Sequence, residues 1–219
     1  MLKYGLMTDN KGDYKDLLWR LYAITPSSRE LGKVKLIETS IPVFAKNGVN
    51  KQVFSEIAKR AGVSRALLYY HFKNENELFD RAMIFVRNHG QNFIIREMQK
   101  AKGNARDELH RYVKAQLNWA SSYPNFVRVH LMYYPMASRH KKLREKNTEL
   151  VKTGKRRIAA ILEVGEKQGL WRIDSLERTA QRIHMMLTGA FVSLLTENRE
   201  NALEDLSELV IEQLELSLR

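Results

Sequence analysis

Two short helical segments separated by a tight turn constrain this chain more than any other feature. They are predicted over residues 52–60 and 64–72, with Gly62 in the turn between them. Neither segment is stable alone, because so short a helix does not offset the cost of its own nucleation. Both must therefore bury their apolar residues against the preceding helix, which ends at Asn47-Gly48. The pattern predicts a three-helix unit that contains a helix-turn-helix.

The rest of the chain continues with helical periodicity. Among 219 residues there are 11 Gly and 4 Pro, and long alternating runs of the strand type are absent. Pro42 is expected to kink its helix, Pro135 to interrupt the helix that begins at Pro124, and Asp174 to cap a later helix. We predict an all-α fold in three parts. They are an N-terminal arm with a short helix over residues 1–28, the three-helix unit over residues 29–75, and a larger helical domain over residues 76–219.

The composition excludes several classes of site. Cysteine is absent, which removes disulfides, thiolate zinc sites and cysteine nucleophiles and is typical of a reducing compartment. The six histidines show no metal-ligand spacing, and no Gly-rich phosphate loop is present. No apolar run approaches the ~20 residues that span a bilayer, and residues 1–10 lack a signal-peptide core. We expect a cytoplasmic protein that is not an enzyme, has no cofactor or metal, and does not enter the membrane.

The charge is unevenly distributed. The formal net charge is +12, which makes nucleic acid or another polyanion a plausible partner. Residues 139–167 hold ten basic and four acidic residues, whereas residues 168–219 hold five basic and nine acidic residues. The basic run is either a solvated helix face or an anion site, and the sequence leaves both open.

The second helix of a helix-turn-helix enters the major groove of DNA, with its N-terminal residues at the base edges. Here that helix carries hydroxyl, aromatic and cationic side chains of the kind that contact phosphates. An alternative is that its two tyrosines are ordinary, partly buried aromatics. The candidate DNA-contacting residues are Ser64, Arg65, Leu67, Tyr69, Tyr70, His71 and Lys73.

These residues stand in a longer motif. Residues 56–65 read EIAKRAGVSR, residues 68–72 read LYYHF and residues 77–79 read ELF. Together they resemble the DNA-binding domain of tetracycline-repressor (TetR-type) regulators, over about residues 29–80. The resemblance implies a DNA-binding domain over residues 29–75 whose two tyrosines contact phosphates, and a ligand-binding and dimerisation domain over residues 76–219.

Three departures from the pattern that the resemblance implies concern five positions. Gln52 and Val53 stand where the family has small hydroxyl residues, so a phosphate-binding cap is missing. Ala66 with Leu67 can touch a thymine methyl group but cannot hydrogen-bond a base. Glu75 stands where a lysine is common, and its carboxylate would repel a nearby phosphate.

Large apolar side chains in residues 76–219 have two interpretations. They are either core residues or the lining of the effector cavity that the resemblance implies, with His130 and Gln116 as polar groups. The candidate ligand-binding residues are Trp119, Phe126, His130, Tyr133, Met136, Trp171, Met185 and Met186. The last two predicted helices carry more apolar residues than one layer buries, which predicts a dimer interface. Its candidate residues are Leu187, Phe191, Leu194, Leu206, Val210 and Leu214.

The sequence thus predicts a homodimeric transcriptional repressor. It would bind double-stranded DNA as an inverted repeat and be released by a small apolar or amphipathic effector. The alternative is a protein-interaction module on the same fold with weakened DNA binding, which Gln52, Val53 and Glu75 favour.

Overall fold

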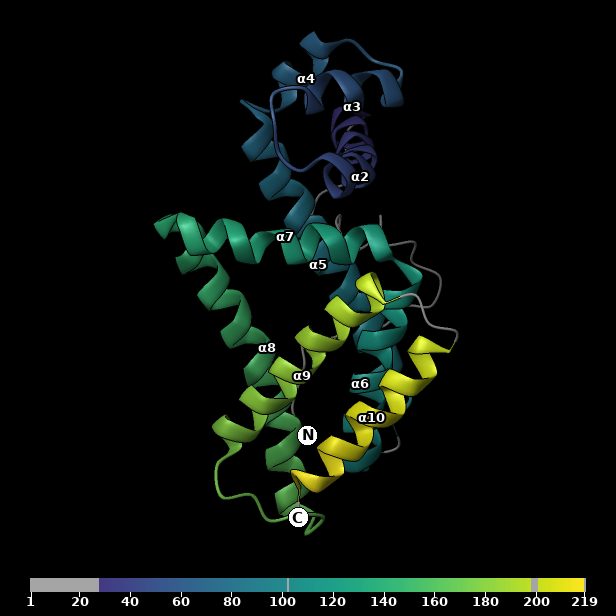
Figure 1. Cartoon of the computed structure of the whole chain (residues 1–219), viewed down its shortest axis with the longest axis vertical. Coiled ribbons are helices and arrows are strands. Elements are labelled where there is room, and N and C mark those ends of the chain that lie inside the picture. Colours follow the sequence, from purple (N-terminus) through teal and green to yellow (C-terminus); the bar gives the residue numbers. More distant parts are fainter. Residues whose placement is uncertain (1–27, 102, 198–200, 219) are drawn as a thin grey trace.

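The computed structural model describes residues 28–101, 103–197 and 201–218, and every regular element in these ranges is an α-helix. The predicted all-α fold is confirmed, whereas the arm predicted over residues 1–28 lies almost wholly outside the described residues. Figure 1 shows a small helical unit above a larger bundle. The small unit comprises α2 (Ser28–Asn47), α3 (Val53–Ala61) and α4 (Arg65–His71).

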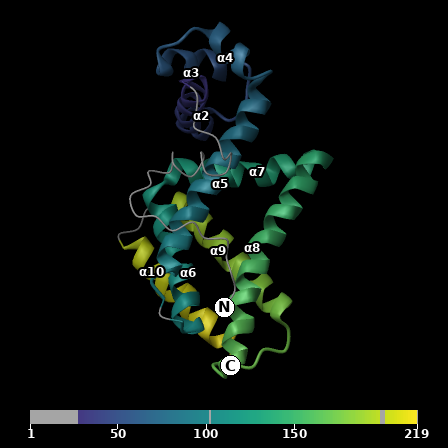
Figure 2. The same cartoon turned by 180° about the vertical axis from the view of Figure 1, so that it is seen from behind.

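The larger bundle begins with a helix that it shares with the small unit. This helix, α5, descends from the small unit into the bundle, and α7 crosses beneath the small unit (Figure 1). Seen from behind, α5 and α6 run together on one side and α8 lies on the other (Figure 2). The bundle helices are α5 (Glu75–Met98), α6 (Ala105–Ser122), α7 (Pro124–Arg139), α8 (Lys141–Lys167), α9 (Leu176–Thr196) and α10 (Ala202–Leu216).

The small unit has the apolar core that its short helices require. Ile41 and Phe44 of α2, Ile57 of α3 and Leu68 of α4 are all completely buried. Burying a side chain of this kind stabilises the fold by about 1.5–3 kcal/mol. The predicted burial of both short helices is therefore confirmed, with α3 packed on α2 and α4 packed on α3.

Local hydrogen bonds fix the turn and the start of the reading helix, α4. Gly62 has φ 68°, a left-handed conformation that glycine adopts without steric cost. Oγ of Ser64 accepts a hydrogen bond from the backbone N–H of Leu67 at 3.2 Å and so caps α4. The side-chain amide of Asn47 donates to the carboxylate of Glu56, which ties α2 to α3. These contacts hold α4 in one orientation on the unit.

The helix α5 is also capped as its sequence indicates. Oδ1 of Asn74 accepts a hydrogen bond from the N–H of Glu77 at 3.0 Å. In return, Oε2 of Glu77 accepts one from the N–H of Lys73 at 2.8 Å. The start of α5 is thereby fixed, with only three residues between the end of α4 and the first residue of α5.

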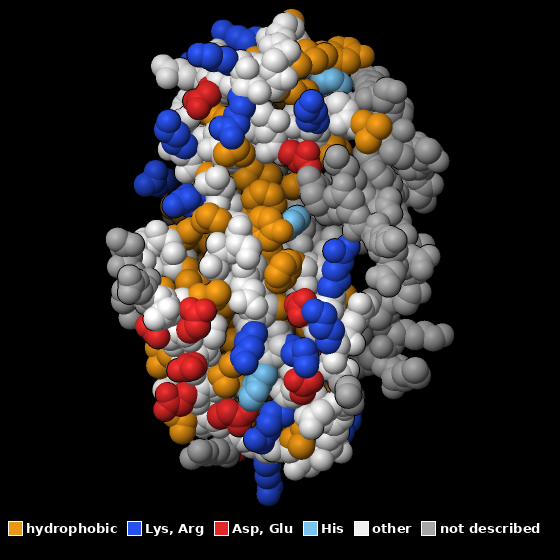
Figure 3. All heavy atoms as spheres, turned by 90° about the vertical axis from the view of Figure 1, so that its right-hand side faces the viewer, with side chains coloured by type: hydrophobic (Ala, Val, Ile, Leu, Met, Phe, Trp, Pro, Cys, Tyr) orange, Lys and Arg blue, Asp and Glu red, His pale blue; other side chains and the backbone are white. Residues whose placement is uncertain are grey.

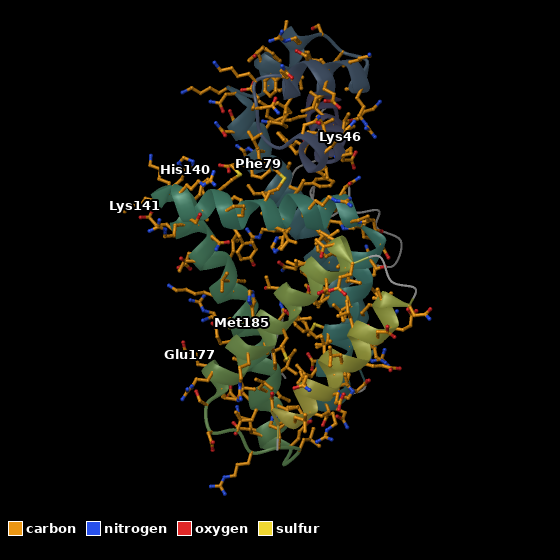
Figure 4. All side chains as sticks on the ribbon, viewed as in Figure 1. Lys46, Phe79, His140, Lys141, Glu177 and Met185 are labelled. Atoms are coloured by element: carbon orange, nitrogen blue, oxygen red, sulfur yellow. The ribbon has the colours of Figure 1, made fainter. Side chains whose placement is uncertain are left out.

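Aromatic side chains join the small unit to the bundle. Phe79 of α5, labelled in Figure 4, meets Phe44 edge to face with ring centroids 5.2 Å apart. The same ring lies nearly parallel to Tyr133 of α7, with centroids 6.4 Å apart and an interplanar angle of 16°. Tyr133 therefore belongs to the contact between the two parts of the molecule.

Two expectations about helix ends are wrong. Pro135 was expected to interrupt α7, but α7 continues through it to Arg139, because packing on several neighbouring helices compensates for one missing N–H. The cap of α9 is Ser175 and not Asp174, since Oγ of Ser175 accepts the N–H of Arg178 at 3.3 Å. The helix α2 likewise runs to Asn47 with Pro42 inside it.

A buried tryptophan closes the lower end of the bundle. Nε1 of Trp171 donates a hydrogen bond to the carbonyl of Leu162 at 2.8 Å. Its ring lies so close to Gly165 that a Cβ atom there would come within 1.9 Å of the ring.

Among the helices of the described ranges, none is long and apolar enough to cross a membrane.

Candidate DNA-binding and effector sites

The reading helix lies at one end of the molecule, at the top of Figure 1. Leu68 is its buried anchor, while Tyr69 and Tyr70 are 46% and 63% exposed. Of the other candidate DNA-contacting residues, His71 is half-buried and the rest are exposed, namely Ser64, Arg65, Leu67 and Lys73. One helix and the residues beside it therefore present all seven candidate side chains.

Aromatic contacts hold part of this surface in place. The ring of Tyr69 packs on Phe54 of α3 with centroids 4.8 Å apart. The guanidinium of Arg65 lies 6.0 Å from the centroid of the Tyr69 ring, within the range of a cation–π interaction. Because its ring is held, the Tyr69 hydroxyl is available in a restricted orientation.

The departures from the TetR-type pattern have structural counterparts. Gln52 makes no side-chain capping hydrogen bond to α3. Instead, Oδ1 of Asn50 accepts the N–H of Gln52 at 2.9 Å, a contact that the sequence analysis missed. Glu75 lies in the first turn of α5 and is half-buried.

The bundle contains a cavity of about 150 Å³ between α5, α6, α7, α8 and α9. Trp119 and His130 of the predicted set line it, and so does Gln116. Tyr133 and Trp171 are buried elsewhere, and Met185, labelled in Figure 4, is 61% exposed. The remaining candidates are partly buried and do not line it, namely Phe126, Met136 and Met186.

Two arginines line the same cavity, and the sequence analysis did not select them. Arg87 lies on α5 and Arg157 on α8. A signal for Arg87 exists, because it falls on the helical stripe of the buried residues Met83, Gly90 and Ile94. An arginine on a buried stripe indicates either a buried ion pair or a ligand.

The cavity has a positive electrostatic character. Burial, followed by the charges of Arg87 and His184, lowers the pKa of His130 to about 4. Burial also lowers the pKa of Arg87 and, together with Lys155, that of His184. Among the described residues that line the cavity, none is an aspartate or glutamate.

Five of the six candidate dimer residues are buried within the chain itself, and Leu194 is half-buried. Sequence periodicity could not separate the inward stripe of α9 and α10 from the outward one, because both stripes contain apolar residues. The outward stripe of α9 carries Met185, Gly189 and Val192, and that of α10 carries Leu209 and Leu216. Figure 3 shows basic side chains over the upper part of one face and a group of acidic ones at its lower left, with further basic side chains beside them.

Within the residues that the structure describes, no group of three His, Asp or Glu side chains could hold a metal ion. The features with functional geometry are therefore the exposed reading helix, the charged cavity and the outward face of α9 and α10.

Comparison with known proteins agrees with this geometry. The family model "Bacterial regulatory proteins, tetR family" matches residues 36–82. The chain is 46% identical over 46 residues to the "Probable acrEF/envCD operon repressor" of Escherichia coli K12, a match that spans 21% of each protein. It is 25% identical over 152 residues to the transcriptional regulator QacR of Staphylococcus aureus, which covers 68% of this chain and 78% of QacR.

The fold also matches a solved structure over most of its length. A candidate transcriptional regulator from Saccharomonospora viridis, solved in complex with choline, superposes with a TM-score of 0.76 at 21% identity. The superposition covers 84% of this chain and 96% of that protein. The exposed reading helix on a three-helix unit above a helical bundle is thus the architecture of a helix-turn-helix domain joined to a larger helical domain. Residues 36–82 match the DNA-binding domain model of the TetR family, and the chain as a whole is similar to QacR over 68% of its length.

Proposed function

We propose that this protein is a homodimeric transcriptional repressor that leaves an inverted-repeat operator when a small effector occupies its cavity. The observation that carries the proposal is that a single helix, α5, begins beside the reading helix and lines the cavity further along. A ligand that favours one position of α5 would shift the equilibrium between DNA-binding and non-binding states. Repression is the role named for the E. coli relative, which is 46% identical to this chain over 46 residues.

The seven candidate residues on and beside the reading helix are suited to different parts of the DNA. Tyr69, Tyr70 and Lys73 are suited to phosphates, because they offer exposed hydroxyl or ammonium donors. Arg65 is suited to a guanine edge near the start of the helix, and Leu67 to a thymine methyl group. Ser64 is already used as the helix cap.

The outward face of α9 and α10 supports a two-fold dimer. Met185, Gly189 and Val192 have the spacing of one helical stripe, and a Cβ atom at Gly189 would meet nothing within 4 Å. A partner helix could therefore approach α9 closely at Gly189 and bury Met185 and Val192. Such a dimer would present two reading helices to half-sites about 34 Å apart.

Selection of bound sequences from a random duplex pool tests the proposal. The expected product is an inverted repeat whose half-sites are a whole number of helical turns apart. A single half-site bound equally well by a monomer would contradict it. Light scattering on the free protein checks the dimer, and Val192→Glu should shift it towards the monomer.

The second candidate function is a protein-interaction module. It is favoured by two features: the Gln52 side chain makes no capping hydrogen bond to α3, and the carboxylate of Glu75 lies beside the expected DNA path. Binding of any duplex that weakens steeply with salt supports the regulator, because phosphate contacts release counterions. Absence of duplex binding at low salt supports the module.

A further inference from the structure

The cavity holds two positive charges and no described negative one. Arg87 enters from α5 and Arg157 from α8, and neither guanidinium makes a hydrogen bond or ion pair with any described residue. A partly buried guanidinium without a carboxylate partner has lost part of its hydration and gained no ion pair in return. This arrangement is complete only when an anion supplies the missing charge.

Neutral hydrogen-bonding groups surround the two arginines. Nε2 of Gln116 donates to the hydroxyl oxygen of Tyr112 at 2.9 Å, which leaves the phenolic hydrogen of Tyr112 free to donate to another acceptor. Arg157 lies close enough to Tyr112 to counteract the rise in its pKa that burial causes. Arg87 likewise lies close enough to His130 for its charge to lower the pKa of the imidazole. The polar side of the cavity therefore offers donors from α5, α6, α7 and α8.

The other side of the cavity is apolar. Trp119 and Phe191 pack with ring centroids 6.1 Å apart, and both line the cavity together with Ile94 and Leu187. Its volume of about 150 Å³ equals that of an engineered apolar cavity that binds benzene. A ligand of this size has the body of one aromatic ring or of a short aliphatic chain.

We propose that the cavity binds a small organic carboxylate, with its anionic group on Arg87 and Arg157 and its apolar body against Trp119 and Phe191. Arginine suits this task because its planar fork of N–H donors matches the two oxygens of a carboxylate. The inference rests on the proposed effector role of this cavity and specifies the chemical class of the effector. The S. viridis protein was solved with choline, which is a cation and not an anion. The described lining of this cavity contains no carboxylate that could pair with a cation.

Calorimetric titration of the full chain tests the proposal with three matched series. The probes are benzoate and hexanoate, their neutral amides, and the corresponding amines. We expect at least one carboxylate to bind saturably and at least 10-fold more tightly than its amide, with no binding of the amines. Carboxylates that bind no better than their amides, or do not bind at all, overturn the proposal.

Two variants locate the anionic group. Arg87→Gln and Arg157→Gln should each weaken carboxylate binding by about 10-fold or more, because each removes a charge-assisted hydrogen bond. Arg156→Gln is the matched control, since Arg156 is exposed on the neighbouring position of α8 and does not line the cavity. Thermal unfolding of each variant checks that the fold is kept. Equal loss in all three variants contradicts the assignment.

DNA affinity, measured separately by fluorescence anisotropy, distinguishes the two proposals. If the carboxylate binds without changing DNA affinity, the carboxylate site stands and the effector role fails. If DNA binding is intact and no carboxylate binds, the effector class is wrong and the DNA-binding function stands.

Discussion

Nζ of Lys146 on α8 donates a hydrogen bond to Oδ2 of Asp80 on α5 at 2.7 Å. This bond, together with the charge of Asp80, raises the pKa of Lys146. Asp80 lies one turn and a half after the start of α5, and Arg87 lies two turns further along the same helix. The pair therefore fixes α5 to the bundle between the reading helix and the cavity.

Replacing Lys146 with Met should reduce the coupling between ligand binding and DNA binding. The pair is largely exposed, so the loss of stability should stay within about 1 kcal/mol. The ratio of DNA affinities without and with ligand should fall about 2- to 30-fold, because one contact that restrains α5 is lost. Anisotropy with and without a bound carboxylate measures this ratio. Lys152→Met is the control, since Lys152 pairs only with Glu149 of its own helix among the described residues. An equal effect there would contradict the role of Lys146.

The two exposed tyrosines of α4 should act on phosphates. Tyr69→Phe and Tyr70→Phe should each weaken binding to all duplex sequences about equally, by roughly 0.5–1.5 kcal/mol for each hydrogen bond lost. The check is the affinity of each variant for the selected operator and for a scrambled duplex. A changed sequence preference at constant overall affinity would instead assign that tyrosine to base reading.

Glu75→Lys should strengthen general DNA binding, because a repelled phosphate would become a paired one. The slope of log affinity against log salt should become steeper by up to about 1–2 units. Glu204→Lys makes the same charge change on exposed α10 and serves as the control. If the two variants behave alike, Glu75 acts through net charge and does not face the DNA.

Sequence alone was sufficient for features that depend on neighbouring residues. Gly62, Ser64 and Asn74 could be assigned because turns and caps are set by local backbone geometry. The cavity could not be assigned in the same way, because its lining depends on which faces of five separate helices meet. Trp171 is a large aromatic residue of the kind that lines ligand cavities, yet its ring packs on Gly165 instead.

The contact of Trp171 with Gly165 gives a prediction for stability. Gly165→Ala should destabilise the fold by about 1–3 kcal/mol, because the added methyl group would overlap the buried ring and force it to move. Gly32→Ala is the control, since a Cβ atom there meets nothing within 4 Å and alanine favours the helix by about 1 kcal/mol. Urea unfolding measures both variants. Equal stability of the two would show that the ring moves without cost.

His130 should make the fold less stable in mild acid. Its pKa is lowered from 6.5 to about 4, so between these values the unfolded chain binds a proton that the native state does not. Stability contributed by the neutral ring is thus present above pH 6.5 and is lost as the pH falls towards 4, with a slope of at most about 1.4 kcal/mol per pH unit. The charged or titratable groups that line the same cavity are Arg87 of α5, Tyr112 of α6, Tyr134 of α7, Arg157 of α8 and His184 of α9.

Urea unfolding between pH 7.5 and 5 measures this slope. His130→Gln should flatten it, whereas His140→Gln should leave it unchanged, because His140 is exposed at the junction of α7 and α8 (Figure 4). An unchanged slope in His130→Gln would assign the acid sensitivity to other groups.

The length of the shared helix α5 determines how far its start moves when its other end tilts. Its 24 residues form a rod about 36 Å long, and Ile94, near its cavity end, lies about 28 Å from its first residue. A tilt of about 5° at that end would move the start of the rod sideways by about 2 Å, because an α-helix transmits rotation with little internal bending. A displacement of a fraction of a bond length around a small ligand is thereby magnified at the far end. Two such rods in a dimer would change the spacing of the reading helices by about the length of one hydrogen bond or more.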